Sequence, residues 1–124
     1  MLLSELIDCL EQNPVIAAVG EDKWEAALAS PAQVLFHLAA ELTTVKERIA
    51  QAHKAGKLLL VHIDLAEGIG KDRVGIRYLA ECGVDGIIST KGQLIRYAKE
   101  VGLVTVQRFF ALDSKGMDSI EDTL

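Results

Sequence analysis

Short apolar segments alternate along the chain with segments whose apolar residues recur every three or four positions. The apolar segments are too short for stable helices and rich in Val, Ile and Leu, which favours strands. Their nearly continuous hydrophobicity is typical of a parallel sheet that is buried on both faces. The predicted strands cover residues 14–19, 33–38, 57–64, 84–89 and 103–107.

The segments between these strands have the apolar spacing of amphipathic helices. Two of them follow an aspartate, Asp22 or Asp72, whose carboxylate can cap the first helical turn. In the second segment, Leu42 begins the apolar stripe that we expect to face the sheet. The predicted helices run from Asp22 to Ala29, over about 41–55, from Asp72 to Gly83 and from about 91 to Gly102.

Five repeats of strand, loop and helix predict an α/β fold with an all-parallel sheet and right-handed crossovers. The length of 124 residues suits a single domain over 1–124. An amphipathic helix over 2–11 and a helical turn at Met117 and Ile120 complete the predicted elements. The repeats fit either a doubly wound open sheet or part of a (β/α)8 barrel, which normally takes roughly 250 residues.

Composition and charge argue against several classes of protein, namely non-specific nucleic-acid binders, membrane proteins and metalloproteins. A net charge of −5 disfavours non-specific nucleic-acid binding, which depends on neutralising phosphates. We expect a cytoplasmic protein without a membrane segment, because no signal peptide is apparent and no apolar run approaches the roughly 18 residues of a span. Cys9 and Cys82 are then expected as free buried thiols, and no spacing of His, Cys or acidic residues indicates a metal site.

Polar side chains gather where the last three predicted strands end. In parallel α/β folds the carboxyl ends of the strands carry function. By alternation, His62 and Asp64 share one strand face, where we expect them to meet the residues that end the next two strands. Lys71 is a further cation close by. The candidate site residues are His62, Asp64, Ser89, Thr90, Lys91, Gln107 and Arg108.

Such a set suits a small, anionic, hydroxylated ligand. Arginine offers fork-shaped donors to phosphate and lysine a mobile charge, while the amides that open a helix can hold phosphate oxygens. Other interpretations stay open: His62 as a hydrogen-bonded core residue, Asp64 as a cap of its own loop, and 89–91 as an ordinary helix start. Asp64 with Lys91 would also suit proton transfer in a barrel enzyme.

Six segments of this sequence, taken in their order, resemble one family. They are NPVIAAV (13–19), VHIDL (61–65), GIGKD (68–72), DGIISTK (85–91), TVQRF (105–109) and LDS (112–114). Together they are similar to the glycerol uptake operon antiterminators, which are glycerol-3-phosphate-responsive regulators. The combination is specific, although each segment alone is not.

The resemblance implies a TIM-barrel-like fold and a regulator instead of an enzyme, with no cofactor and no catalytic residue. Its effector would be glycerol 3-phosphate, and its partner the leader mRNA of glycerol-utilisation genes, on which it prevents premature termination. By match to these motifs, Asp64, Ser89, Lys91, Gln107 and Arg108 are the leading site residues. Asp64 and Gln107 would bind hydroxyls, and Lys91 and Arg108 would meet negative charge.

The chain is shorter than the family it resembles, which continues for about three further strand–helix units before a barrel closes. We therefore expect an incomplete barrel of about five strands, whose open edges favour association into homo-oligomers. Two alternatives remain: an enzyme acting on a phosphorylated sugar or polyol, and an inactive fragment of the regulator. Cations that could meet RNA form two groups, Lys46, Arg48, Lys54 and Lys57, and Arg73, Arg77, Arg96 and Lys99.

Overall fold

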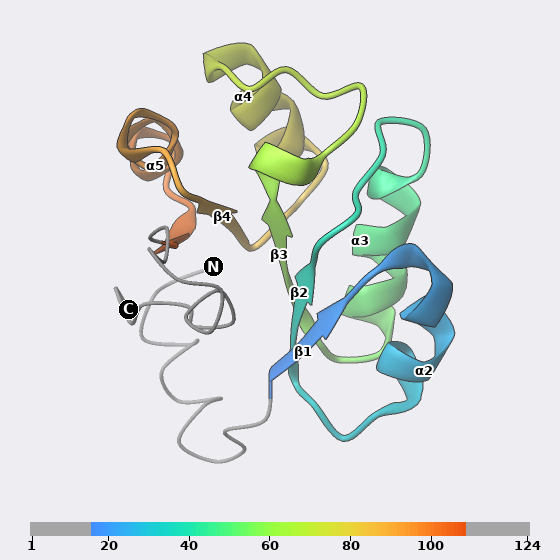
Figure 1. The fold of residues 1–124 in the computed structure, drawn as a ribbon. Coiled ribbons are helices and arrows are strands. Elements are labelled where there is room, and N and C mark those ends of the chain that lie inside the picture. Colours follow the sequence, from blue (N-terminus) through green and yellow to red (C-terminus); the bar gives the residue numbers. More distant parts are fainter. Residues whose placement is uncertain (1–15, 109–124) are drawn as a thin grey trace, which may run out of the picture.

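The computed structural model describes residues 16–108, which form a curved, all-parallel sheet of five strands with helices around one side (Figure 1). The predicted helix 2–11, Cys9 and the turn at Met117 and Ile120 lie outside these residues. The strands are β1 (Ile16–Val19), β2 (Val34–His37), β3 (Leu58–His62), β4 (Gly86–Ser89) and β5 (Val104–Gln107). The helices are α2 (Trp24–Ala29), α3 (Val45–Lys54), α4 (Arg73–Glu81) and α5 (Gly92–Glu100), with 3-10 turns η1 (Glu21–Lys23) and η2 (Ile63–Leu65).

The order of the strands distinguishes between the two predicted architectures. Neighbouring strands follow one another in the sheet as β1-β2-β3-β4-β5, and every pair is parallel. A doubly wound sheet reverses its order part-way and carries helices on both faces. An unbroken order with the helices on one side is the arrangement of a TIM barrel. The sheet is open, so the prediction of an incomplete, TIM-barrel-like fold is confirmed.

Each face of the sheet carries its own apolar cluster. On the helix-covered face, Leu35, Leu59, Val61 and Ile87 pack against α2 to α5. The opposite face, which we call the inner face, carries a second cluster, and its buried members within residues 16–108 all come from strands. Its buried members are Val34, Phe36, Leu60, Ile88, Val104 and Val106.

Gly86 allows the strands of the inner face to approach closely. A Cβ at this position would lie 2.6 Å from the Val104 carbonyl oxygen and 2.8 Å from Leu60 Cγ. Because both neighbours belong to adjacent strands, a larger residue would force the strands apart. The glycine of the DGIISTK segment therefore has a packing function.

Helix starts agree only partly with the predictions. Asp72 caps α4 as expected, since its carboxylate accepts a 2.8 Å hydrogen bond from the Gly75 amide. Asp22 does not cap α2; it lies in η1, and Lys23 occupies the cap position without a side-chain hydrogen bond. Leu42 is 43 % exposed and lies in the turn before α3, which begins only at residue 45. It does not lie on the inward stripe.

The loops at the carboxyl edge of the sheet support one another. Glu41 and Glu67, which follow β2 and β3, form an isolated parallel bridge. The Glu67 amide donates to the Ala40 carbonyl at 2.8 Å, and the Glu67 carbonyl accepts from the Leu42 amide at 2.9 Å. These bonds fix the start of the GIGKD loop against the loop before α3.

Two ionisable groups are buried at the opposite, amino-terminal edge. Asp85 accepts hydrogen bonds from the Leu59 amide at 2.8 Å and pairs with His53 Nε2 at 2.7 Å. The Lys57 ammonium is buried and donates to the carbonyl oxygens of Ser30 and Ala32. His53 therefore has a structural partner at this edge, and burial removes Lys57 from the cations that could contact RNA.

Two further expectations concern the thiols and the membrane. Cys82 is free, as predicted, but half-buried instead of fully buried. Over residues 16–108, no helix combines the length and the hydropathy of a bilayer-spanning segment.

Candidate functional site

The carboxylate of Asp64 connects the carboxyl ends of β3 and β4. Ser89 Oγ donates to Asp64 Oδ1 at 2.6 Å, and the amide and hydroxyl of Thr90 both donate to Oδ2 at 2.7 Å. We call these three residues the Asp64 network. Asp64 lies in the 3-10 turn η2 and not in the strand, so its expected alternation with His62 is wrong. Leaving the strand lets its side chain reach β4.

The Asp64 network continues into the start of α5. The hydroxyl of Ser89 is buried and accepts a 3.0 Å hydrogen bond from the Lys91 amide. Lys91 is the N-cap residue of α5, and its own side chain makes no cap hydrogen bond. The interpretation of 89–91 as a helix start is therefore correct. The network also places the first amides of α5 beside the strand ends, where an anion is favoured.

Asp64 stays ionised in this environment. Burial raises the pKa of its carboxyl group, but the hydrogen bonds from Ser89 and Thr90, together with nearby His62, outweigh burial and hold it below its usual value. A carboxylate that accepts three hydrogen bonds and has a lowered pKa is a weak proton acceptor. The geometry therefore disfavours Asp64 as a general base.

His62 lies on the inner face, beside Leu60 and opposite Ile88 in the register of β4. It is 2 % exposed, and neither ring nitrogen has a hydrogen-bond partner within the described part of the chain. Burial lowers the pKa of the imidazole; the charge of Asp64 and the residue's own backbone oppose this shift, and the charge of Arg108 adds to it. His62 is thus a neutral, buried residue, but it is not the hydrogen-bonded core histidine considered above.

Gln107 and Ser89 occupy the helix-covered face, contrary to expectation. They are register partners, each one residue beyond a pair formed by Ile88 and Val106 on the inner face. The Gln107 amide nitrogen lies close to Gly92 at the start of α5. The structure therefore separates Gln107 from His62, because successive residues of a strand point to opposite faces.

Arg108 extends the ladder between β4 and β5. Its amide donates to the Ser89 carbonyl at 2.9 Å, and its charge is near enough to act on His62. Lys91 is exposed at the start of α5. Lys71 instead donates to the Ala66 carbonyl at 3.1 Å and so folds back onto its own loop. Lys91 and Arg108 both adjoin Ser89 through their backbone amides, and they are the cations of the candidate site.

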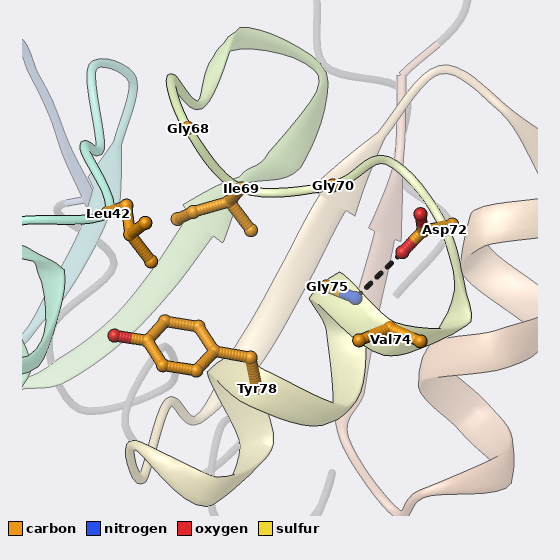
Figure 2. Close-up of a pocket in the computed structure, with 8 residues that line it drawn as sticks. All are labelled: Leu42, Gly68, Ile69, Gly70, Asp72, Val74, Gly75 and Tyr78. Carbon is orange, nitrogen blue, oxygen red and sulfur yellow. Dashed lines mark hydrogen bonds between the residues drawn. The ribbon is translucent and has the colours of Figure 1, made fainter.

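A pocket that was not predicted from the sequence has a volume of about 280 Å³, and Figure 2 shows the residues that line it. It lies between the GIGKD loop, Leu42 and α4, and it contains none of the seven candidate residues. Asp72 is the acidic residue of this lining, and its side chain already caps α4. Its signal in the sequence is Gly75, where a Cβ would lie 1.8 Å from the Gly70 carbonyl oxygen. The pocket is lined by Leu42, Gly68, Ile69, Gly70, Asp72, Val74, Gly75 and Tyr78.

In chemical terms, the carboxyl edge offers an ionised carboxylate, two cations, a neutral imidazole and the amides that open a helix. Such a set can hold an anionic, hydroxylated molecule without covalent chemistry. Over residues 16–108, no group of three or more His, Cys, Asp or Glu side chains could hold a metal ion.

Comparison with known proteins identifies the family. The sequence model described as "Glycerol-3-phosphate responsive antiterminator" matches residues 15–124. The chain belongs to this family. The resemblance noted in the sequence is thereby confirmed, over all five strands of the sheet.

Relatives of known structure share the fold. One is the glycerol uptake operon antiterminator regulatory protein of Listeria monocytogenes, with 33 % identity and a TM-score of 0.75 over 83 % of this chain. Another is a glycerol uptake operon antiterminator-related protein of Thermotoga maritima, with 33 % identity and a TM-score of 0.70 over 81 % of this chain. The uncharacterised protein YgcP of Escherichia coli K12 is 34 % identical over 94 % of this chain.

The chain spans only part of each of these antiterminator relatives. It covers 57 % of each of the two crystal structures and 62 % of YgcP. This agrees with a sheet of five strands that is not closed.

Proposed function

We propose that this chain is a glycerol-3-phosphate-responsive transcription antiterminator that binds the leader mRNA of glycerol-utilisation genes. It acts as a cytoplasmic regulator without a cofactor and not as an enzyme. Membership of the antiterminator family supports this function. The observation that carries it in the structure is the Asp64 network, which joins two strand ends to the start of α5 beside Lys91 and Arg108.

Glycerol 3-phosphate matches the chemistry of this edge. Its phosphate would lie against Lys91, Arg108 and the first amides of α5, where positive charge and helix dipole add. Its hydroxyl groups require neutral donors and acceptors nearby. The proposed binding residues remain His62, Asp64, Ser89, Thr90, Lys91, Gln107 and Arg108, with Asp64, Ser89 and Thr90 holding the edge in shape.

RNA binding by an acidic chain requires a local cluster of cations. The group on α3 and the following loop is weakened by burial of Lys57 and by Arg48, which packs over Trp24 and bonds to Gln51. On α4 and α5, Arg77, Arg96 and Lys99 are exposed, although Arg73 pairs with Glu100 at 3.3 Å. The second group is therefore the better candidate for contact with RNA phosphates.

Thermal unfolding tests the effector. Glycerol 3-phosphate at about 100 times its dissociation constant should stabilise the chain by about 2.7 kcal/mol, because the ligand binds only the folded state. Glycerol and inorganic phosphate at equal concentration should raise the midpoint less. Replacing Lys91 and Arg108 with Ala should remove the shift, while the Lys46→Ala control keeps it. A cooperative transition that glycerol 3-phosphate leaves unchanged would contradict the proposal.

Filter binding to a leader transcript tests the RNA partner. Affinity should rise with glycerol 3-phosphate and fall with salt, because phosphate contacts release counterions. An RNA of equal length and scrambled sequence is the control. Equal binding of both RNAs, or no dependence on glycerol 3-phosphate, would argue against an antiterminator. Sedimentation in the same buffers would show whether the open sheet edges assemble homo-oligomers, as we propose.

A further inference from the structure

We propose that His62, in place of Asp64, recognises a hydroxyl group of the effector, so that the effector lies over the inner face of the sheet. This inference rests on the proposed function and adds the orientation of the ligand. It assigns the polyol end to the imidazole and the phosphate end to Lys91 and Arg108.

The first support is the state of the His62 ring. The residue is 2 % exposed, and both ring nitrogens lack a hydrogen-bond partner among the residues that the structure describes. Buried polar atoms are nearly always paired, because an unpaired one loses its hydration without compensation. A ligand oxygen that reaches the ring would supply the missing partner.

The second support is that Asp64 is already occupied. Its two oxygens accept three hydrogen bonds from Ser89 and Thr90, all between 2.6 and 2.7 Å. Ser89 lies on the helix-covered face, so these bonds direct the carboxylate toward β4 and the start of α5. To bind a ligand hydroxyl through the same lone pairs, Asp64 would have to give up bonds that hold the edge together.

The third support is charge. Burial and the neighbouring Arg108 keep the imidazole neutral at neutral pH. A neutral imidazole has one donor and one acceptor, which is the pair that a hydroxyl group needs. A phosphate dianion accepts only, and its natural partners here are Arg108 and Lys91. The neighbours of His62 on the inner face, Leu60 and Ile88, are apolar and buried, so they offer the imidazole no competing hydrogen-bond partner.

Calorimetric titration of the wild type and of two variants tests the inference. The ligands are glycerol 3-phosphate and inorganic phosphate. His62→Phe keeps a ring of similar size without hydrogen-bonding atoms and should weaken glycerol 3-phosphate binding about tenfold, which is one hydrogen bond of about 1.4 kcal/mol. It should leave phosphate binding unchanged. His62→Gln restores a donor and an acceptor and should recover part of the affinity.

His53→Phe is the matched control, because this histidine lies at the opposite edge of the sheet with Asp85. It should bind both ligands like the wild type, even where its unfolding midpoint is lower. His62→Phe binding glycerol 3-phosphate as tightly as the wild type would overturn the inference and leave the proposed function intact. A parallel loss of phosphate binding would also overturn it, by assigning His62 to the phosphate. A wild type that binds neither ligand would contradict the proposed function itself.

Discussion

Ser89 on β4 donates a 2.6 Å hydrogen bond to Asp64, which lies beyond the end of β3. The two residues are 25 positions apart in the sequence, yet this contact and the two bonds from Thr90 decide the shape of the carboxyl edge. Because Ser89 also accepts from the Lys91 amide, the carboxylate of Asp64 positions the start of α5 through one hydroxyl. A ligand that binds at this edge would therefore contact a surface whose shape depends on the hydrogen bonds of Asp64, Ser89 and Thr90.

Asp64→Asn should destabilise the fold. The asparagine amide presents two donors where the carboxylate presented only acceptors, so at least one donor of Ser89 or Thr90 loses its partner. Hydrogen bonds to charged groups contribute about 1.5–3 kcal/mol each, and we expect a loss of about 2 kcal/mol in urea unfolding at pH 7. The exposed Glu67→Gln, on the same loop, is the control and should stay within about 0.5 kcal/mol of the wild type. Equal midpoints for both variants would show that the network is not stabilising.

The decrease in unfolding free energy at acid pH should depend on Asp64. Its pKa is lower in the folded chain than in the unfolded chain, so it contributes stability above the unfolded value of about 3.9. That contribution is lost as pH falls through the lowered folded pKa. Urea unfolding between pH 5 and pH 2 should therefore show a smaller decline for Asp64→Asn than for the wild type. A decline of the same size would contradict the assigned pKa direction.

His62 should make stability depend on pH near neutrality. The folded chain disfavours the imidazolium, so the unfolded chain binds the proton more readily and the stabilising effect is complete above about pH 6.5. Below that value stability is lost as the unfolded histidine becomes protonated. His62→Phe should flatten the profile of unfolding free energy between pH 7 and pH 5. A His62→Phe profile parallel to that of the wild type would show that other groups cause the dependence.

Lys57→Met should lower the free energy of unfolding without changing the affinity for RNA. Its ammonium is buried and donates to two backbone carbonyls, which the thioether cannot satisfy. We expect a loss of about 1–3 kcal/mol in urea unfolding, and unchanged affinity for the leader transcript under conditions where both proteins are folded. Lys54→Met, an exposed neighbour at the end of α3, is the control for the loss of one charge. Weaker RNA binding by Lys57→Met alone would place this lysine at the interface.

Gly75→Ala should disrupt the loop that precedes α4. The new methyl group would lie 1.8 Å from the Gly70 carbonyl oxygen, far below van der Waals contact, and the atom it meets is backbone. Overpacking of this kind costs about 1–3 kcal/mol or more. Gly92→Ala, in the first turn of α5, meets nothing closer than 3.7 Å and should be nearly neutral. Equal stability of the two variants in thermal unfolding would show that the loop can move away freely.

Local pattern predicted most of the fold. The five strands, the four helices of the described residues and the cap at Asp72 follow from hydrophobic period and from residues that act on their nearest neighbours. The failures at Asp22 and Leu42 are also local, since a 3-10 turn and a turn before α3 have no distinct hydrophobic pattern. The strand ends also predicted that Asp64, Ser89 and Thr90 lie close together, because parallel strands all end at one edge.

The sequence by itself determined the number and order of the strand–helix units, and it carried the six segments that resemble the antiterminator family. Only the tertiary structure decided that the strands follow one another without reversal, that Asp64 is occupied by Ser89 and Thr90, and that Gln107 faces away from His62. The burial of Lys57 beneath Ser30 and Ala32 belongs to the same class of facts. Hydrophobic period acts over a few residues, whereas these contacts join residues about 25 positions apart through strand register.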